Sequence, residues 1–169
     1  MDLLGQPRQR PFAPARGHLT IHSAPTSLAR HVEWALAAVL GSGVEIAWKP
    51  QPLLAGTHRT SFEWRDREGA GAEIASSLRG WHYLRFELWE ESESEKVLYR
   101  FTPELGIHRA VIDSAGAVLL TENQIKVAQT LSDDEMREEL ARALGTNWDL
   151  ELDQFRRVEL EAISQSQAG

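Results

Sequence analysis

Residues 82–89 carry the pattern that most constrains the fold, because apolar and polar side chains alternate from Tyr83 to Leu88. The apolar residues are Leu84, Phe86 and Leu88, and they alternate with Tyr83, Arg85 and Glu87. Successive side chains of a β-strand point to opposite faces of a sheet, so the segment predicts a strand with one buried face. Such a strand needs neighbouring strands and a second layer over its apolar face.

Five further patterns precede this strand. Strands are predicted at 17–22, 44–49 and 57–65, and helices at 23–41 and 70–79. Ser23 is expected to cap the first helix and Gly41 to end it. In order, the elements read β-α-β-β-α-β, the arrangement of ferredoxin-like domains, whose helices cover one face of an antiparallel sheet.

The sheet is expected to continue towards the C-terminus. Strand patterns at 97–102 and 107–113 flank a turn signal, and a short strand is expected at 117–120. Capping-box sequences that begin at Thr121 and Ser132 introduce a helical segment. We therefore predict an α+β domain with a ferredoxin-like antiparallel sheet, extended by a C-terminal hairpin and followed by short helices.

One domain is expected to account for the chain, because 169 residues is an ordinary length for a single domain. Residues 1–16 contain three arginines and three prolines without an apolar stripe, which predicts a disordered tail. The domain is expected at 17–161, with its helical part at about 121–161, and residues 162–169 are expected to fray.

The composition excludes several classes of protein. The chain has no cysteine, which excludes disulfides and thiolate zinc sites. Its formal net charge of -7 repels phosphate backbones, so we do not expect nucleic acid as a partner. No apolar run is long enough for a signal peptide or a membrane span, so a soluble, cytoplasmic protein without membrane association is expected.

The histidines do not predict a metal site. His18 and His22 lie on one side of a predicted strand, but at about 3.3 Å per residue they are about 13 Å apart and cannot share one metal ion. The chain also lacks the paired histidine spacings typical of helical metal sites. We expect no metal and no cofactor.

The junction between the first predicted strand and helix is the candidate ligand site. A helix N-terminus presents unpaired amides and partial positive charge to an anion. The residues expected to contact such an anion are His22, Ser23 and Arg30. A hydrolase would use Ser23 as nucleophile with His22 or His31 as its base, although Ser23 also matches an ordinary N-cap and no G-x-S-x-G elbow surrounds it.

Trp34 lies off the apolar stripe of the first predicted helix. On a helical wheel it is more than about 90° from Leu28, Val32 and Val39, on a side shared with His31. Two interpretations stay open. Either the C-terminal helices cover Trp34, or it anchors a partner, because Trp is enriched among interface hot spots.

The polar face of the sheet is a second candidate partner surface. The residues expected to share it are mildly basic and aromatic: His18, His22, Arg59, Arg65, Tyr83, Arg85 and Arg100. An analogy with RNA-recognition motifs ranks lower, because the strand at 57–65 offers charged and small residues where stacking aromatics are expected. The candidate partner interface is therefore His31, Trp34, Arg59, Tyr83 and Arg85.

Six short segments follow one another in an order that resembles a known family. They lie at 22–25, 31–36, 78–81, 84–87, 101–107 and 143–149. Over about residues 18–157 the chain resembles the actinobacterial family catalogued as domain of unknown function 3145. The resemblance implies no activity and no catalytic residue. It suggests a link to bacterial fatty-acid synthesis, near whose genes members of the family occur.

The leading hypothesis is a non-enzymatic accessory or regulatory protein that binds another protein, with a link to fatty-acid or acyl metabolism. The alternative is an enzyme or small-ligand binder that recognises a phosphate or acyl-thioester group at the first strand–helix junction. RNA binding through the sheet face ranks third. The sequence also leaves a homo-oligomer open.

Overall fold

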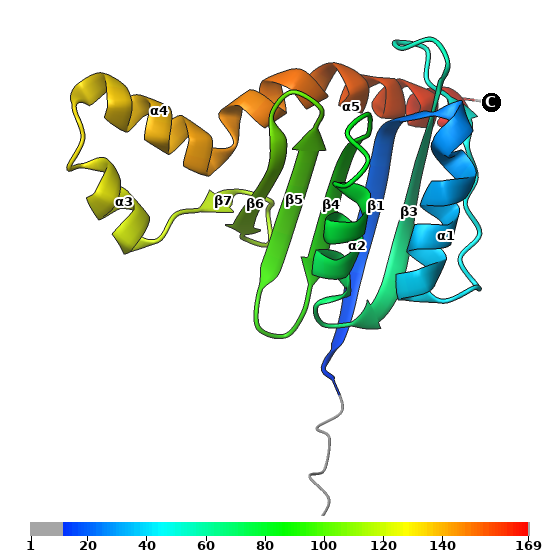
Figure 1. Cartoon of the computed structure of the whole chain (residues 1–169), viewed down its shortest axis with the longest axis horizontal. Helices are drawn as coiled ribbons and strands as arrows, with labels where there is room; N and C mark the ends of the chain where they lie inside the picture. The colour runs from blue at the N-terminus through cyan, green and yellow to red at the C-terminus, as the bar shows by residue number, and fades with distance from the viewer. Residues whose placement is uncertain (1–11, 169) are drawn as a thin grey trace, which may run out of the picture.

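The computed structural model describes residues 12–168, which form one antiparallel sheet of seven strands and five α-helices. The elements in chain order are β1 (Pro14–Pro25), the 3-10 helix η1 (Thr26–Leu28), α1 (Ala29–Leu40), β2 (Lys49–Pro50), β3 (Thr57–Arg67), α2 (Ala70–Leu78), β4 (Arg85–Glu91), β5 (Lys96–Thr102), β6 (Gly106–Ile112), β7 (Val118–Leu119), α3 (Glu122–Ala128), α4 (Asp133–Leu144) and α5 (Thr146–Gln167). The strand order is β2-β3-β1-β4-β5-β6-β7 (Figure 1). The predicted α+β class and antiparallel sheet are confirmed.

β1 is the strand around which the sheet is built. It pairs with β3 on one side and with β4 on the other. Leu19 of β1 is aligned with Phe62 and with Leu88, so the apolar side chains of three strands share one face. The register shifts after Ile21, and this irregularity breaks the alternation of buried and exposed residues at the end of the strand.

α1 and α2 cover the apolar face of the sheet, as Figure 1 shows. Val32 of α1 and Ile74 and Leu78 of α2 are fully buried in the same core as Phe86 of β4. Burying an aliphatic side chain contributes about 1.5–3 kcal/mol, so this layer is the main source of stability. The prediction that the first two helices share one face of a sheet of at least five strands is confirmed.

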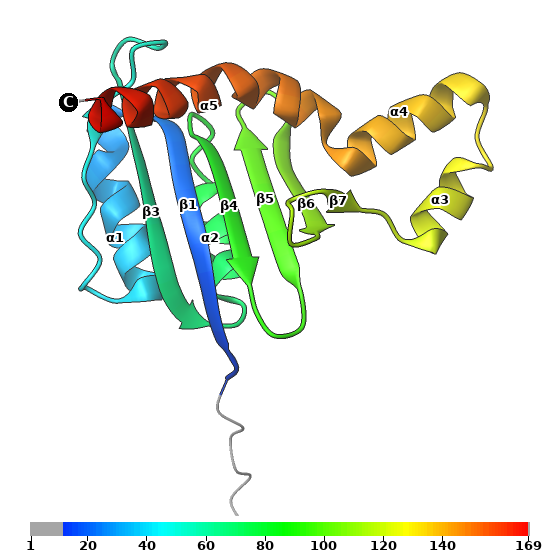
Figure 2. The ribbon, with the colours of Figure 1, turned by 180° about the vertical axis from the view of Figure 1, so that it is seen from behind.

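α5 crosses the opposite face of the sheet near one end of the strands (Figure 2). Its inner side buries Trp148, Leu152 and Phe155. Trp148 Nε1 donates a hydrogen bond of 2.9 Å to the carbonyl oxygen of Gly106 in β6. The sheet is thus covered on both faces at this end, and Figure 2 shows no helix over the second face at the other end.

α3 and α4 form a helical hairpin that projects away from the sheet beyond β7 (Figures 1 and 2). This hairpin, residues 122–144, is called the arm below. Ala128 is its one buried residue. The arm therefore contributes little to the core that α1, α2 and α5 complete.

Both predicted helix starts in the arm carry their capping interactions. The Gln124 amide donates to Thr121 Oγ1 at 3.2 Å, and the Thr121 amide donates to Gln124 Oε1 at 2.8 Å. The Ser132 amide donates to Glu135 Oε2 at 3.1 Å. These side chains satisfy amides that the first turn of a helix leaves unpaired.

The first helix begins later than predicted. β1 continues to Pro25, and α1 starts at Ala29 after η1, so the prediction that Ser23 caps a helix is wrong. The irregular end of β1 carries Ser23 into the core, where it is fully buried. The strand predicted at 44–49 is also wrong over most of its length, because Trp48 Nε1 donates to Glu33 Oε1 of α1 at 2.8 Å and the segment packs beside α1.

Other boundaries differ by several residues. β4 begins at Arg85 and α5 reaches Gln167, past the end expected near residue 161. Residues 14–16, expected in the disordered tail, belong to β1. Residues 12 and 13 precede β1 without regular secondary structure, and residues 1–11 of that prediction lie outside the described part of the chain. The order of the whole sheet also differs from that of a four-stranded ferredoxin-like sheet, because β5, β6 and β7 extend it beyond β4.

At Gly17, β1 lies too close to its neighbours to leave room for a side chain. A Cβ at Gly17 would come closer than van der Waals contact to the Trp64 indole and to the backbone oxygen of Trp89. Because a strand carbonyl cannot move without disturbing the sheet, Gly17→Ala is expected to lower the free energy of unfolding by about 1–3 kcal/mol in a urea titration. Gly43→Ala is the control, since a Cβ there meets nothing within 4 Å. Equal losses in both variants would contradict the account.

Candidate functional site

The residues predicted to bind an anion at the first junction are buried beside α5. His22 is 2% exposed and Ser23 is 0% exposed. His22 Nε2 donates to Glu87 Oε2 at 2.7 Å, and the His22 carbonyl accepts a hydrogen bond of 2.8 Å from Gln51 Nε2. The His22 ring also faces the Phe155 ring of α5, at 6.2 Å between centroids. The strand–helix junction is therefore closed to a ligand from solvent.

The other groups of the predicted site do not assemble around it. Arg30 is an exposed residue of α1, and among the described residues no hydrogen bond or ion pair joins it to His22. Ser23 Oγ is buried without a hydrogen-bond partner in the described part of the chain. The nucleophile–base pair that a Ser23 hydrolase would need is therefore not formed.

Glu87 is the centre of an ionic network between the sheet and α5. Arg156 Nε of α5 donates to Glu87 Oε2 at 2.9 Å, and Arg156 Nη2 donates to Asp149 Oδ1 at 2.8 Å. Arg100 Nη1 of β5 donates to the same Asp149 oxygen at 2.6 Å. Together with His22, these side chains connect β1, β4 and β5 to α5.

The electrostatics of this network favour a structural role. Burial by itself would raise the pKa of Glu87, but the hydrogen bonds from Arg156 and His22 outweigh burial and lower the pKa to about 2. The bond to Glu87 in turn raises the pKa of Arg156. A general base works best with a pKa near the working pH, so the Glu87 carboxylate is a poor proton acceptor at neutral pH and a good counter-ion.

His108 connects β6 to the C-terminal end of α4 by a hydrogen bond. Its Nε2 donates to the carbonyl oxygen of Ala143 at 3.1 Å, and its Nδ1 accepts a hydrogen bond of 3.2 Å from Arg100 Nη2. Burial, followed by the charge of Arg100, lowers the pKa of His108. The imidazole is thus held neutral, in the one tautomer that satisfies both bonds.

Arg59 and Arg85 were predicted to contact a partner through the polar face of the sheet. In the structure both form ion pairs with carboxylates of α5. Arg59 forms an ion pair with Glu159, and Arg85 Nε donates to Glu151 Oε1 at 3.3 Å. The Arg85 guanidinium also lies over the Phe155 ring, 5.3 Å from its centroid. Arg59 and Arg85 are therefore engaged within the chain and do not lie on a free surface.

The other three residues of the predicted partner interface are exposed. Trp34 is 62% exposed on α1, and its ring meets the exposed His31 ring edge-on at 5.4 Å between centroids. Because α5 lies on the opposite face of the sheet from α1, the interpretation in which the C-terminal helices cover Trp34 is wrong (Figures 1 and 2). Tyr83, in the loop before β4, is 71% exposed. These residues are free to contact a partner.

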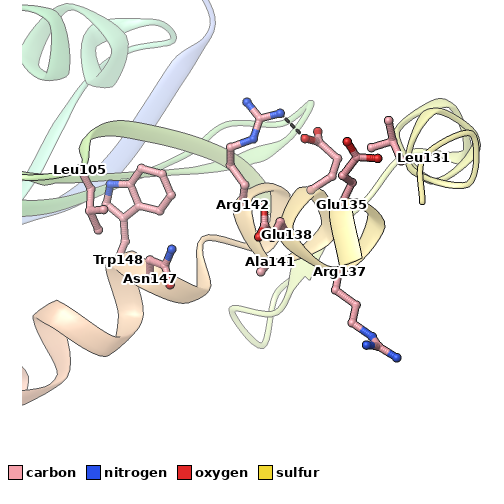
Figure 3. A pocket seen from close by; sticks show the side chains of 10 residues that line it. Leu105, Leu131, Glu135, Arg137, Glu138, Ala141, Arg142, Asn147 and Trp148 are labelled. Atoms are coloured by element: carbon pink, nitrogen blue, oxygen red, sulfur yellow. Dashed lines mark hydrogen bonds and ion pairs between the residues drawn. The ribbon is translucent and has the colours of Figure 1, made fainter. Parts of the chain in front are cut away.

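A cleft of about 800 Å³ opens between the arm and the turn that joins β5 to β6. Figure 3 shows Leu105 and Trp148 at one end of the cleft and Leu131 at the other. The wall between them is formed by α4. Its charged side chains are Glu135, Arg137, Glu138, Glu139 and Arg142. The cleft thus has apolar ends and a charged middle.

Exposed apolar side chains gather on the arm and where it leaves the sheet. Seven of the large hydrophobic residues that are at least 36% exposed lie here: Leu105, Leu119, Ile125, Val127, Leu131, Leu144 and Leu150. This surface was not predicted from the sequence. The available signal was charge, since seven of the twelve residues of α4 are acidic or basic, a pattern of a helix exposed over most of its circumference.

Residues 12–168 contain no group of three or more His, Asp or Glu side chains arranged to hold a metal ion. In the same range, no helix combines the length and apolar character that crossing a bilayer requires. The expectation of no cofactor stays a prediction.

Comparisons with known proteins identify a family. The model described as "Protein of unknown function (DUF3145)" matches residues 18–165, which is most of the chain, so the resemblance found in the sequence is confirmed. Neither the curated proteins nor the solved structures include a match.

The network around Glu87 predicts a pH-dependent stability. Because the pKa of Glu87 is 4.5 in an unfolded chain and about 2 in the fold, Glu87→Gln is expected to lower the free energy of unfolding by about 3 kcal/mol at neutral pH. The carboxylate contributes fully above about pH 4.5, and its contribution disappears as the pH falls towards about 2. Denaturant unfolding of both proteins across this range measures the difference.

The control is Glu122→Gln, whose carboxylate is 81% exposed and pairs with Lys126 at the surface. This variant is expected to change the free energy of unfolding by less than about 0.5 kcal/mol. If the difference in free energy of unfolding between Glu87→Gln and the unmodified protein stays constant from neutral to acidic pH, the charged carboxylate of Glu87 does not stabilise the fold as proposed.

Proposed function

The chain belongs to the family described as protein of unknown function DUF3145, and we propose that it is a non-enzymatic accessory protein that binds another protein through the arm. The observation that carries this proposal is that the arm projects from the sheet with Ala128 as its one buried residue (Figure 1). Exposed apolar surface that is concentrated in one region is typical of protein-interaction sites.

The energetics of the arm support a partner. Isolated helices shorter than about 12–15 residues are marginal in water, and α3 and α4 have 7 and 12 residues. The caps at Thr121 and Ser132 contribute about 0.5–2 kcal/mol each, and surface ion pairs contribute less. A partner that covers Val127, Leu131 and Leu144 would supply the apolar burial that the rest of the chain does not give the arm.

The exposed side of α1 is a second surface that suits the same function. Trp34 is large, exposed and amphipathic, and such residues are frequent hot spots of protein interfaces. Tyr83, in the loop before β4, is exposed as well. The polar sheet face supports partner binding less well, because α5 engages Arg59 and Arg85.

We further propose that the protein acts in the cytoplasm, in fatty-acid or acyl metabolism. The proposed pathway rests on the family resemblance, through the genes near which members occur. The absence of cysteine is consistent with a reducing compartment.

The competing hypotheses have weaker support. An enzyme or anion-binding protein that used His22, Ser23 and Arg30 would need α5 to move, because His22 and Ser23 are buried and Arg30 lies apart from them. RNA binding through the sheet face would meet the carboxylates of α5 at one end of that face. Neither hypothesis explains why the arm extends away from the core.

Affinity capture from a lysate of the source cell, followed by mass spectrometry, tests the proposal with matched variants. Val127→Glu places a charge on a residue of the arm that is 51% exposed, so the domain is expected to stay folded. If Val127 contributes about 2 kcal/mol to binding, the variant recovers partners about thirtyfold less well. Leu160→Glu adds the same charge on α5, at a residue that is 64% exposed, and is expected to retain them.

The variant Trp34→Ala decides between the arm and α1. Because Trp34 is 62% exposed, the substitution is expected to leave the stability within about 0.5 kcal/mol of that of the unmodified protein. Partners lost with Val127→Glu and kept with Trp34→Ala support the arm. Partners lost with Trp34→Ala alone would assign binding to α1, and a lysate that yields no specific partner would contradict protein binding.

A further inference from the structure

We infer that the cleft between the arm and the β5–β6 turn receives a short amphipathic helix of another protein, which carries basic side chains beside its apolar face. The inference rests on the proposed function and specifies the chemistry of the partner segment.

The shape of the cleft suits a single helix. α4 has 12 residues and is therefore about 18 Å long, the length of a helix of about the same number of residues. Leu131 lies at one end of the cleft, and Leu105 and Trp148 lie at the other, so apolar contacts are available to both ends of an occupant (Figure 3). The volume of about 800 Å³ gives room for its side chains.

A helix fits this cleft better than an extended strand. Strand addition requires the free backbone amides and carbonyls of a sheet edge. The long wall of the cleft is the side of α4, whose interior backbone groups are bonded within the helix. The polar groups that the wall offers are side chains, so they select the side chains of the occupant and not its backbone.

The charge that the cleft presents is acidic. Both basic residues of the wall are paired within α4, because Arg142 forms an ion pair with Glu139 and Arg137 forms one of 3.6 Å with Asp134. Glu138 has no ion-pair partner among the described residues. Hydrogen bonds from Ser132 lower the pKa of Glu135, so its carboxylate is charged at neutral pH.

These carboxylates lie at helical spacing along the wall. Glu135 and Glu138 are three residues apart, so they are neighbours on one side of α4. An occupant that places Lys or Arg one turn apart would match them, and its apolar side would cover Leu131 and Leu105.

The same charge argues against a second copy of this chain as the occupant. α4 and α5 each contain five acidic and two basic residues, a net charge of -3 for each helix (2 minus 5). None of the α-helices in the described residues has more basic than acidic side chains. Docking one of them into the cleft would bring like charges together.

The test uses two fluorescent model helices of about 14 residues. One is built from Leu and Lys at amphipathic spacing, and the other has Glu in place of every Lys. Fluorescence anisotropy at physiological ionic strength is expected to detect binding of the Leu/Lys helix to the full chain and no binding of the Leu/Glu helix.

Matched double variants locate the site. Glu135→Gln with Glu138→Gln is expected to weaken binding of the Leu/Lys helix about tenfold, because two ion pairs are lost. Gln at position 135 can still accept the Ser132 amide, so the cap of α4 is retained. Glu45→Gln with Glu93→Gln removes the same charge from exposed residues outside the arm and is expected to change the affinity little.

Three outcomes would overturn the inference. The Leu/Lys helix could fail to bind, or both double variants could weaken its binding equally, which would indicate attraction to the net charge alone. The third is a dimeric mass in light scattering that the cleft variant alone reduces to a monomer, which would make a second copy the occupant. If cellular partners still depend on Val127 while neither model helix binds, the inference fails and the proposed function stands.

Discussion

The ionic contact between α5 and the polar face of the sheet is the constraint that determines which surfaces of the domain stay uncovered. Arg59, Arg85 and Arg100 project from three strands, and each would be a poorly solvated cation beneath α5 without the carboxylates of that helix. A further ion pair has the opposite arrangement, because the carboxylate of Glu87 belongs to the sheet and the guanidinium of Arg156 belongs to α5. The chain's own helix α5 therefore engages the polar sheet face near one end of the strands, and the arm is the α-helical segment with the least burial.

The sequence predicts the parts of the fold in which local pattern and environment agree. Residues 85–89 form part of β4 as predicted, because Phe86 and Leu88 face the core while Arg85 and Glu87 face α5. The pattern fails where tertiary contacts override it. Ser23 has the ordinary signature of an N-cap, but the register shift in β1 keeps it in the strand. Trp48 belongs to an alternating segment, yet its indole bonds to Glu33 of α1 and the segment does not join the sheet.

For the candidate surfaces too, the sequence predicted what local periodicity determines and did not predict contacts between distant parts of the chain. The helical wheel correctly placed Trp34 away from the core, since that inference needs only the period of the helix. Alternation likewise placed Arg85 on the polar face of its strand. What covers that face could not be predicted, because the Glu151 that pairs with Arg85 is 66 residues away along the chain. The exposure of the arm was not predicted. The apolar stripe of α4, which includes Met136 and Leu140, has the same spacing whether the helix packs against a core or only against its neighbour in a hairpin.

The central claim is that the arm has no covering partner within the isolated chain, and amide hydrogen exchange of the purified protein tests it most directly. Opening of a helix with few buried contacts requires little free energy, so amides of α4 are expected to exchange orders of magnitude faster than those of β1 or of α5 around Leu152. Slow exchange in α4 that matches β1 would contradict the claim, because it would mean that the arm is already covered.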